Sequence, residues 1–415
     1  MVNSLRKKVQ EQLKYYAVKR DDRILFRSFY LKQIDSSVDA VASNCILVIR
    51  LDAIGDSVIW LDQAKEYRKR FPNHKLVLFH NISWKDIAER LPYFDECISF
   101  NPQETDIINY YTHKLEEINK YHYDILFSPI HFRSFFIEDW FIHNIKATEK
   151  IGYESDGNRS HKAGLLNKYY RKHAKKYNLL EIGNDWYTKI IPSKSNYMTE
   201  LERNADFVRD AINPAFKSNL PTFPFQITTN KFVPSTEYAV FSMGSSATAR
   251  RWPVSNFVKI AEYIPYNTII LCGSSNESYL GESFIDQYNG TKTIIPLFGK
   301  TTLFELISLI KYAKIVVSNE TSTSHISVAT RTPSVCLLGG GHYGLFQPYV
   351  VDELPEEDKK ILPVIVSSDE KSCFGCDWNC KYPLIDNSWK CIKNISVNSV
   401  IKAIEKITKF QPAFK

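Results

Sequence analysis

No apolar run in the 415-residue sequence approaches the roughly 20 residues that a membrane-spanning helix needs. The basic N-terminus, "MVNSLRKKVQEQLKYY", is not followed by the apolar stretch that a secretory signal contains. Internal repeats and low-complexity tracts are also lacking, so repeat architectures are not expected. We therefore expect a cytoplasmic globular protein that is neither secreted nor membrane-spanning.

Basic charge is scarce outside the N-terminal region. The net charge is +7, and residues 1–33 alone hold nine Lys or Arg against three Asp or Glu. The remainder is nearly neutral, which disfavours nucleic-acid binding through a broad basic surface. A basic helix carrying Leu5, Val9 and Leu13 could touch an anionic membrane surface, or pack as a solvated helix on its own domain.

The rest of the composition is that of a large globular protein. Hydrophobic residues make up 44% of the sequence and aromatic residues 13%, enough for a large core and two domains. Strand-like and helix-like segments alternate in both halves, as in parallel sheets with crossover helices. We expect a basic helical arm over 1–40, Rossmann-like domains over 41–230 and 231–395, and a C-terminal helix over 396–415. The stretch 155–232 is expected to be irregular and to lead into a linker.

The expected elements follow from the apolar runs and the segments between them. In the first domain, strands are expected at 45–51, 75–80, 96–100 and 123–129, and helices near 57–70, 84–90 and 107–120. In the second domain, strands are expected at 238–244, 268–274, 292–299, 314–319 and 334–340, and helices near 254–264, 302–313 and 323–330. Two such sheets predict a cleft between them.

The stretch "ILVIRLDAIGDSVIWL", residues 46–61, places two carboxylates around a glycine where an expected strand ends. Open α/β sheets bind ligands beyond the carboxyl ends of their strands, so this loop is a candidate ligand site. Gly55 permits a tight turn and a close backbone approach. Asp56 stands where the next helix begins, so it either acts on a ligand or only caps that helix.

The second half repeats this pattern in "FSMGSSATARRWP", residues 241–253. A strand ends in a loop of small polar residues, and Arg250 and Arg251 precede Trp252 and a helix. Backbone N–H groups and guanidinium groups in such a loop can bind phosphate oxygens. The alternative is a solvated loop in which Trp252 anchors the start of the helix.

Two further strand ends carry hydroxyls or glycines. In "IVVSNETSTSHISVAT", hydroxyls at 321–324 precede a helix whose first-turn N–H groups favour an anion. The alternative there is ordinary capping, with His325 packed on the helix. In "LLGGGHYGLFQPY", three consecutive glycines and His342 suggest either close approach of the backbone to a ligand or a flexible turn.

Four of the eight cysteines are crowded together as Cys373-x2-Cys376-x3-Cys380-x10-Cys391. This spacing can place four thiolates around zinc or iron, and such a site is structural because no ligand position stays open. Disulfides are not expected in a reducing cytoplasm. Metal-free thiols and a zinc ribbon for nucleic acid are the alternatives. The neutral body of the protein and the aromatic, acid-containing surroundings of the cluster argue against the ribbon.

Taken in order, "ILVIRLDAIGDSV", "ARRWP", "VVSNETSTSHISVA" with "TPSVCLLGG", and the late cysteines resemble glycosyltransferase family 9, the heptosyltransferase family of bacterial surface-glycan assembly. The resemblance covers residues 46–395. It implies an α/β protein of the GT-B fold, in which two Rossmann-like domains face a central cleft, here with an N-terminal helical arm and a cysteine-rich C-terminal insert. It also implies that a sugar, typically heptose from an ADP-linked donor, is transferred with inversion and without a required metal.

The resemblance assigns roles to the motif residues. Asp56 matches the catalytic carboxylate that takes the proton of the acceptor hydroxyl, with Asp52 and Gly55 on the acceptor side. Arg250 matches a phosphate-binding lysine and would act with help from Arg251. The other residues on the donor side are Glu320, Thr321, Ser322, Thr323, His325, Gly339, Gly340 and Gly341. Similar cysteine clusters occur in some members, and one subgroup binds iron there.

The chain departs from the family at two places. Glu320-Thr321-Ser322 stands where the family usually has Asp-Ser/Thr-Gly. The stretch "LCGSSNES" lacks an acid directly after Gly273, where relatives carry one, and Glu277 is a candidate to replace it. These differences leave the exact sugar and its nucleotide open.

The implied partners are an ADP-heptose-like donor and a glycan or glycolipid acceptor at the cytoplasmic face of a bacterial membrane. A protein acceptor is a close variant, because some relatives modify autotransporter adhesins. A non-catalytic nucleotide-sugar binder is a rival that the altered Glu320 to Ser322 segment favours, whereas Asp56 and Arg250 argue against it. The N-terminal arm could serve peripheral membrane docking or self-association, and no nucleic-acid partner is expected.

Overall fold

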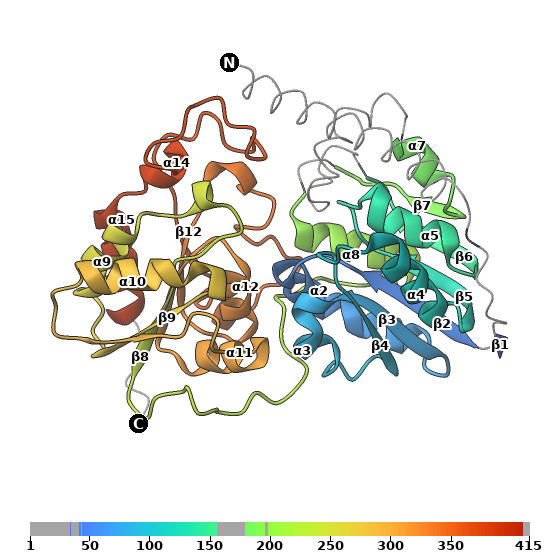
Figure 1. Cartoon of the computed structure of the whole chain (residues 1–415), viewed down its shortest axis with the longest axis horizontal. Helices are drawn as coiled ribbons and strands as arrows, with labels where there is room; N and C mark the ends of the chain where they lie inside the picture. The colour runs from blue at the N-terminus through green and yellow to red at the C-terminus, as the bar shows by residue number, and fades with distance from the viewer. Residues whose placement is uncertain (1–33, 35–40, 43, 156–178, 196–197, 410–415) are drawn as a thin grey trace, which may run out of the picture. The chain divides into compact units, whose positions relative to one another are not determined.

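The computed structural model describes residues 34, 41–42, 44–155, 179–195 and 198–409 (Figure 1). The chain divides into two compact units that interleave along the sequence. The first comprises the described residues of Met1–Leu51, Asn73–Ile82 and Glu96–Pro192, and the second those of Asp52–Pro72, Ser83–Asp95 and Ser193–Lys415. Of the expected helical arm, residues 1–40, only residue 34 is described. The predicted domain limits stay predictions.

The first unit is built on a parallel sheet. Its strands are β1 (Val41–Ala42), β2 (Cys45–Arg50), β3 (Lys75–Asn81), β4 (Glu96–Phe100), β5 (Tyr121–Ser128), β6 (Ala147–Tyr153) and β7 (Lys189–Ile191). Their order is β4-β3-β2-β5-β6-β7, with β1 beside β5, and the pairings are parallel. All six residues of β2 are buried, as expected for a central parallel strand that reads as a continuous apolar run.

The helical segments of the first unit surround an aromatic core. They are α4 (Ile107–Ile118), α5 (Trp140–Asn144), α7 (Leu179–Asn184) and a π-helical turn, η3 (Phe135–Asp139). Phe100 and Phe141 pack with ring centres 5.3 Å apart. The buried Arg133 lies with its Nη1 3.3 Å from Asp139 Oδ1, which also accepts a hydrogen bond from the Tyr187 hydroxyl at 3.0 Å. The Tyr187 hydrogen bond therefore ties η3 to the chain that leads into β7.

The second unit carries another parallel sheet. Its strands are β8 (Tyr238–Ser242), β9 (Thr268–Cys272), β10 (Thr293–Pro296), β11 (Ile315–Asn319), β12 (Ser334–Leu337) and β13 (Val364–Val366), in the order β10-β9-β8-β11-β12-β13. Its helices are α2 (Ile54–Arg70), α3 (Lys85–Ala88), α8 (Glu200–Ala211), α9 (Val254–Ala261), α10 (Ser278–Gln287), α11 (Leu303–Tyr312), α12 (Ser322–Ala329), α13 (Glu356–Lys359), α14 (Lys390–Lys393) and α15 (Val397–Lys409). Short 3₁₀ turns are η2 (Ile82–Trp84), η4 (Thr248–Arg250), η5 (Ser275–Glu277) and η6 (Gly340–His342).

The two sheets have the same winding. In each, the chain moves outward from a central strand in one direction and then crosses over to build the other half. The reversal falls between β2 and β5 in the first sheet and between β8 and β11 in the second. Loops that leave the carboxyl ends of such neighbouring strands diverge, so each reversal point opens a crevice for a ligand.

Helix α2 belongs to the second unit and contacts α8 and α12 (Figure 1). Two buried acids on this helix bind the chain that follows α8. Asp62 Oδ2 accepts the Asn219 N–H at 3.1 Å, and Glu66 Oε2 accepts the Asn213 side-chain amide at 2.9 Å. These bonds anchor the middle of α2 to the segment that follows α8.

The expected strands and helices are present, with ends that differ by a few residues. The expectation that 155–232 is irregular was wrong in part, because β7 and α8 lie within it. Helix α8 has a capping box in which Thr199 accepts the Glu202 N–H and Glu202 accepts the Thr199 N–H. Strands β6 and β13 and helix α10 were also not expected.

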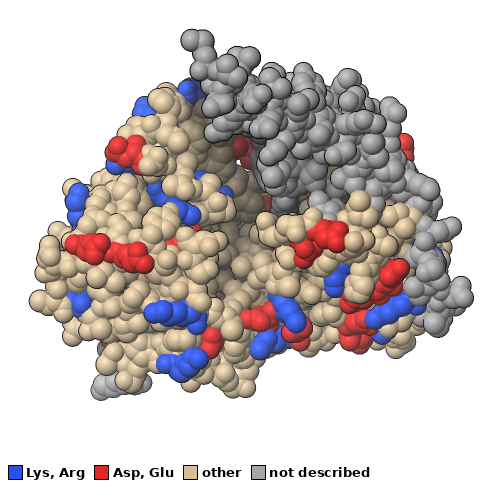
Figure 2. Space-filling model, viewed as in Figure 1, with Lys and Arg blue, Asp and Glu red and all other residues tan. Residues whose placement is uncertain are grey.

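The described surface is mixed in charge. On the face drawn in Figure 2, basic and acidic side chains are interspersed over the described residues, without a broad field of one sign. This distribution agrees with the expectation of no broad basic face on that side of the molecule. Among the described helices, none has the length and apolar character that crossing a membrane requires.

The end of the second sheet is held by one buried side chain. Asn319, the last residue of β11, is 1% exposed. Its Oδ1 accepts the Trp252 N–H at 3.1 Å, and its Nδ2 donates to the carbonyls of Met243 at 2.7 Å and Gly244 at 3.3 Å. One amide thus joins the carboxyl ends of β8 and β11 to the start of α9.

We predict that Asn319→Ala lowers the free energy of unfolding by about 2–4 kcal/mol, because buried backbone groups lose their partners. Urea denaturation of the full chain measures the change. Asn276→Ala is the matched control, since Asn276 is exposed in the same unit and its loss should change stability by less than about 0.5 kcal/mol. Equal stability of the two variants would contradict this role of Asn319.

Candidate active site

The loops after β8 and β11 bring together an arginine and a buried glutamate. Arg250 closes the turn η4, and its Nη2 lies 3.1 Å from Glu320 Oε2 and 3.4 Å from the Glu320 carbonyl oxygen. The Glu320 side chain is only 5% exposed. Burial raises the pKa of Glu320 and Asp56 adds to the rise, while His342 and Arg250 oppose it. The pair thus lies at the reversal point of the second sheet, and the predicted role of both residues on the donor side stays a prediction.

The start of α12 offers further groups to an anion. Thr321 precedes the helix in an extended conformation, and its side chain caps no N–H group. Its Oγ1 is buried and, among the described residues, has no hydrogen-bond partner. The Thr323 hydroxyl donates to Ser242 Oγ at 3.0 Å, so it is already engaged. Thr321 and the first-turn N–H groups are therefore the groups of this segment that are able to receive an anion.

The first turn of α2 lies against the first turn of α12. A Cβ atom on Gly55 would stand 3.2 Å from His325 Cδ2 and 3.7 Å from Ser322 Cα, so glycine permits this close approach. Asp56 Oδ2 accepts the Ala53 N–H at 3.1 Å, which confirms the helix-capping interpretation without excluding a second role. The Asp56 side chain is only partly buried.

His325 is buried and held by a tyrosine. Its Nδ1 lies 2.6 Å from the Tyr349 hydroxyl, and the opposite side of its ring, with Nε2, faces Gly55. Burial lowers the pKa of His325 to about 4, although the charge of Asp56 opposes this shift. The ring is therefore neutral at pH 7.

The Arg251 side chain bonds to Ser245 and Glu277, whereas that of Arg250 bonds to Glu320. Arg251 Nη2 donates to the Ser245 carbonyl at 2.7 Å and lies 3.1 Å from Glu277 Oε1. Glu277 also accepts the N–H groups of Ser245 at 2.9 Å and Ser274 at 3.0 Å. Glu277 thus stands at the carboxyl ends of β8 and β9, and Arg251 braces this loop while Arg250 faces Glu320.

The three consecutive glycines lie against two aromatic side chains of the protein itself, Trp378 and Phe374. A Cβ on Gly339 or Gly341 would stand 2.6 Å or 2.2 Å from the Trp378 ring, and one on Gly340 would stand 2.4 Å from Phe374. Both aromatic residues belong to the cysteine-rich segment. The close approach that the glycines permit is therefore to this segment, and their predicted contact with the donor stays a prediction.

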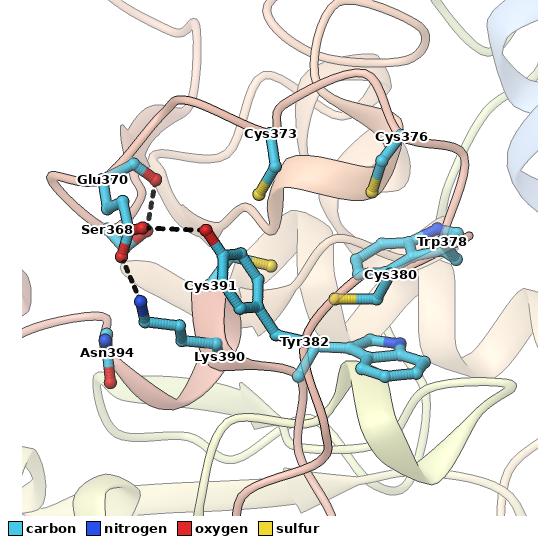
Figure 3. Close-up of a pocket in the computed structure, with 11 residues that line it drawn as sticks. Ser368, Glu370, Cys373, Cys376, Trp378, Cys380, Tyr382, Lys390, Cys391 and Asn394 are labelled. Carbon is cyan, nitrogen blue, oxygen red and sulfur yellow. Dashed lines mark hydrogen bonds and ion pairs between the residues drawn. The ribbon is translucent and has the colours of Figure 1, made fainter.

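The four clustered cysteines line one pocket with Trp378, Tyr382 and Trp389. Figure 3 shows their thiols directed toward this pocket from two stretches of chain. The Gly340 N–H donates to Cys391 Sγ at 3.4 Å. Within the described parts of the chain, no group of three or more His, Cys, Asp or Glu side chains is arranged to hold a metal ion.

Asp52 was expected on the acceptor side, and that role stays a prediction. It is 3% exposed, and its carbonyl accepts the Trp84 indole N–H at 3.2 Å. Sequence reasoning missed Asn319, Tyr349 and Trp378, whose roles depend on contacts between distant segments. The strand-end position of Asn319 was the one available signal.

The buried His325 predicts a pH dependence of stability. Its pKa is about 4 in the folded protein against an ordinary value of 6.5, so protons bind the unfolded chain more tightly. The stabilisation is complete above pH 6.5 and is lost as the pH falls toward 4, by ~3 kcal/mol. Urea denaturation from pH 7 to 4 should show a smaller loss in His325→Gln, which does not titrate. Parallel pH profiles of the two proteins would contradict the burial of a neutral imidazole.

Comparison with known sequences identifies a family, and relatives that match only part of this chain. The sequence model of glycosyltransferase family 9 (heptosyltransferase) matches residues 116–353, more than half of the chain. Lipopolysaccharide heptosyltransferase 3 of Escherichia coli K12 is 26% identical over 150 residues, 32% of this chain and 44% of that protein. Lipooligosaccharide heptosyltransferase 2 of Haemophilus influenzae is 30% identical over 95 residues, 22% of this chain and 28% of that protein. The matches span less than half the length of these curated relatives.

Solved structures share the fold over most of both chains. A family 9 glycosyl transferase from Veillonella parvula gives a TM-score of 0.65 at 15% identity, covering 88% of this chain and 97% of that one. E. coli heptosyltransferase WaaC with ADP gives 0.59 at 15% identity, covering 88% and 99%. The iron-containing dodecameric glycosyltransferase TibC from enterotoxigenic E. coli gives 0.50 at 13% identity, covering 91% and 81%, and has also been solved with ADP-D-beta-D-heptose.

These likenesses confirm the predicted GT-B fold of two parallel-sheet α/β domains. They say nothing of the predicted central cleft, which stays a prediction. The family's sequence model covers more than half of the chain, and the strand-end motifs lie in the order that suggested this family. The protein therefore belongs to glycosyltransferase family 9.

Proposed function

We propose that the protein transfers a heptose-type sugar from a nucleoside-diphosphate donor to a bacterial surface-glycan or lipopolysaccharide acceptor, with inversion at the anomeric carbon. One observation carries the proposal. Asp56, Arg250 and the start of α12 lie in one compact unit, with Asp56 close enough to Glu320 and His325 to shift the pKa of each. A carboxylate base next to an anion site is what such a transfer requires.

Each group has a step in the proposed reaction. Asp56 accepts the proton of the acceptor hydroxyl as that oxygen bonds to the anomeric carbon. The bond from that carbon to the phosphate oxygen breaks, and its electron pair leaves with the nucleoside diphosphate. Arg250 and the first-turn N–H groups of α12 offset the negative charge that develops on the diphosphate, which makes them the stabilising groups of a metal-independent transfer.

Glu320 affects how the donor diphosphate can bind Arg250. Its carboxylate already bonds to Arg250, so the diphosphate must share or replace this contact. The relatives WaaC and TibC have been solved with ADP and with ADP-D-beta-D-heptose, respectively, which makes ADP-heptose the first donor to examine. The longer Glu320 carboxylate supports the proposal that the sugar or its carrier differs in detail.

The proposal predicts that Asp56→Asn lowers kcat by about 10²–10⁴-fold while the Kd for the donor changes by less than about 3-fold, because the base is lost and the anion site is kept. Release of nucleoside diphosphate from ADP-heptose, with mass spectrometry of the acceptor, measures turnover. Asp286→Asn, at an exposed position of α10, is the control and should keep the wild-type rate.

An unchanged kcat in Asp56→Asn would contradict the assigned base. Binding of the donor by the wild-type protein without transfer to any glycan, glycolipid or protein acceptor would instead support a non-catalytic nucleotide-sugar binder. Transfer to a protein alone would select the protein acceptor. The similarity to TibC, together with the cysteine-rich segment, is the observation that keeps this second acceptor class in the proposal.

We also propose that Cys373, Cys376, Cys380 and Cys391 hold a structural zinc or iron ion. The residue types fit, since four thiols line one pocket and thiolates are preferred ligands of both metals, and binding an ion would require the thiols to close in from the positions they hold here. TibC is an iron-containing relative. Bound metal would supply folding stability to the cysteine-rich segment, and no step of the transfer passes through it.

Elemental analysis of the purified full chain should therefore find about one zinc or iron per molecule. Cys376→Ser should lose most of this metal, whereas Cys97→Ser, a change at a half-buried cysteine of β4, should retain it. A chelator should lower the melting temperature and leave kcat per folded molecule unchanged. Metal-free protein with wild-type stability would contradict the proposal.

We also propose that the protein contacts the membrane peripherally and associates with itself. The predicted membrane-docking or self-association segment, residues 1–40, lies largely outside the described residues. TibC is dodecameric, which supports examining the oligomeric state of this chain as well.

A further inference from the structure

The cysteine-rich segment reaches the donor side of the site through two residues, Asp377 and Trp378. They lie between Cys376 and Cys380, and both have a positive φ, 48° for Asp377 and 57° for Trp378. Residues other than glycine adopt this conformation rarely, and they keep it when the surrounding structure fixes it. The segment therefore presents these two side chains in a defined direction.

The Trp378 ring lies against the arginine of the site. The Arg250 guanidinium carbon is 4.8 Å from the Trp378 ring centre, within the range of a cation–π contact. The ring also occupies the space above Gly339 and Gly341, where any Cβ atom would collide with it. The three glycines thus let the indole lie close to the strand end and under Arg250.

The second residue, Asp377, is linked to the same ion pair through His342. Its Oδ1 lies 3.5 Å from His342 Nε2, and His342 Nδ1 lies 3.8 Å from Glu320 Oε2. The His342 and Trp378 rings are also in contact, with centres 5.3 Å apart. The cysteine-rich segment therefore contacts Arg250 directly and Glu320 through His342.

We propose that Trp378 is a positioning residue that orients Arg250 for the donor diphosphate. Stacking on an aromatic face fixes the plane of a guanidinium group and leaves its N–H edges available for bidentate contact with phosphate oxygens. The polar contacts of Arg250 are long: Nη2 lies 3.1 Å from Glu320 Oε2 and 3.4 Å from its carbonyl oxygen, and Nη1 lies 3.4 Å from Ser246 Oγ, so the indole face is the contact that spans the whole guanidinium plane. This inference rests on the proposed function, because it takes Arg250 as the diphosphate-binding residue.

The test is the Kd for ADP, measured by titration calorimetry on the full chain. Trp378→Leu should weaken binding by about 3-fold to about 30-fold, the range of a shielded cation–π contact. Trp378→Tyr and Trp378→Phe should fall between wild type and Trp378→Leu, in that order, because ring attraction for a cation declines from Trp to Tyr to Phe. This order remains measurable if Trp378→Leu does not fold.

A double-mutant cycle separates positioning from general support of the fold. In the Arg250→Ala background, Trp378→Leu should change the Kd by less than about 2-fold, because the arginine through which it acts is gone. Phe304→Leu is the matched control, since it removes a similar ring contact, 4.4 Å from the exposed Arg90, and should leave the Kd unchanged.

The outcomes distinguish this inference from the proposed function. An equal loss of affinity with and without Arg250, or a Kd unaffected by Trp378→Leu in a wild-type protein that binds ADP, would overturn the positioning role alone. A wild-type protein that binds no nucleoside diphosphate and no nucleotide sugar would overturn the proposed function itself.

Discussion

The proposed donor side of the site depends on the buried amide of Asn319. Its three hydrogen bonds join the ends of β8 and β11 to the start of α9. Glu320 directly follows this residue, and Arg250 lies two positions before Trp252, the residue whose N–H the amide accepts. The ion pair between Arg250 and Glu320 is therefore set by the same bonds that close this end of the sheet, so stability and the geometry of the site are linked.

Burial also shifts the pKa values of two groups in the site, Glu320 and His325. The pKa of Glu320 is raised by burial, and the pKa of His325 is lowered by it to about 4. The result is a site in which Arg250 and the amides of α12 provide the positive side, a neutral imidazole packs beside Asp56, and Glu320 competes with any phosphate for the arginine. Two nearby carboxylates oppose an anionic ligand, so the orientation of Arg250 matters more here than in a site without them. In the proposed arrangement, the Trp378 ring beneath Arg250 fixes this orientation.

Much of this arrangement could be predicted from the sequence, because apolar runs mark central parallel strands and ligand sites follow strand ends. Asp56, Arg250, Glu320 and His325 all stand at such positions. Strand β6 could not be predicted in this way, since charged residues interrupt its apolar positions, whereas α8 has signals in the sequence, a capping box and Leu201, Ala205 and Val208 at helical spacing, that the reading of strand ends passed over. The contact of Trp378 with Arg250 joins segments far apart in the chain, and no local pattern encodes it.

The central claim is that Arg250 binds the diphosphate of a nucleotide sugar. The most direct measurement is the melting temperature of the purified protein against a panel of nucleoside diphosphates and nucleotide sugars, for wild type and Arg250→Ala. A ligand that binds the folded state raises its stability by mass action. We expect a concentration-dependent rise with one nucleotide family in wild type, lost in Arg250→Ala but retained in Arg90→Ala, where the arginine is exposed. No rise with any ligand, or an equal rise in Arg250→Ala, would contradict it.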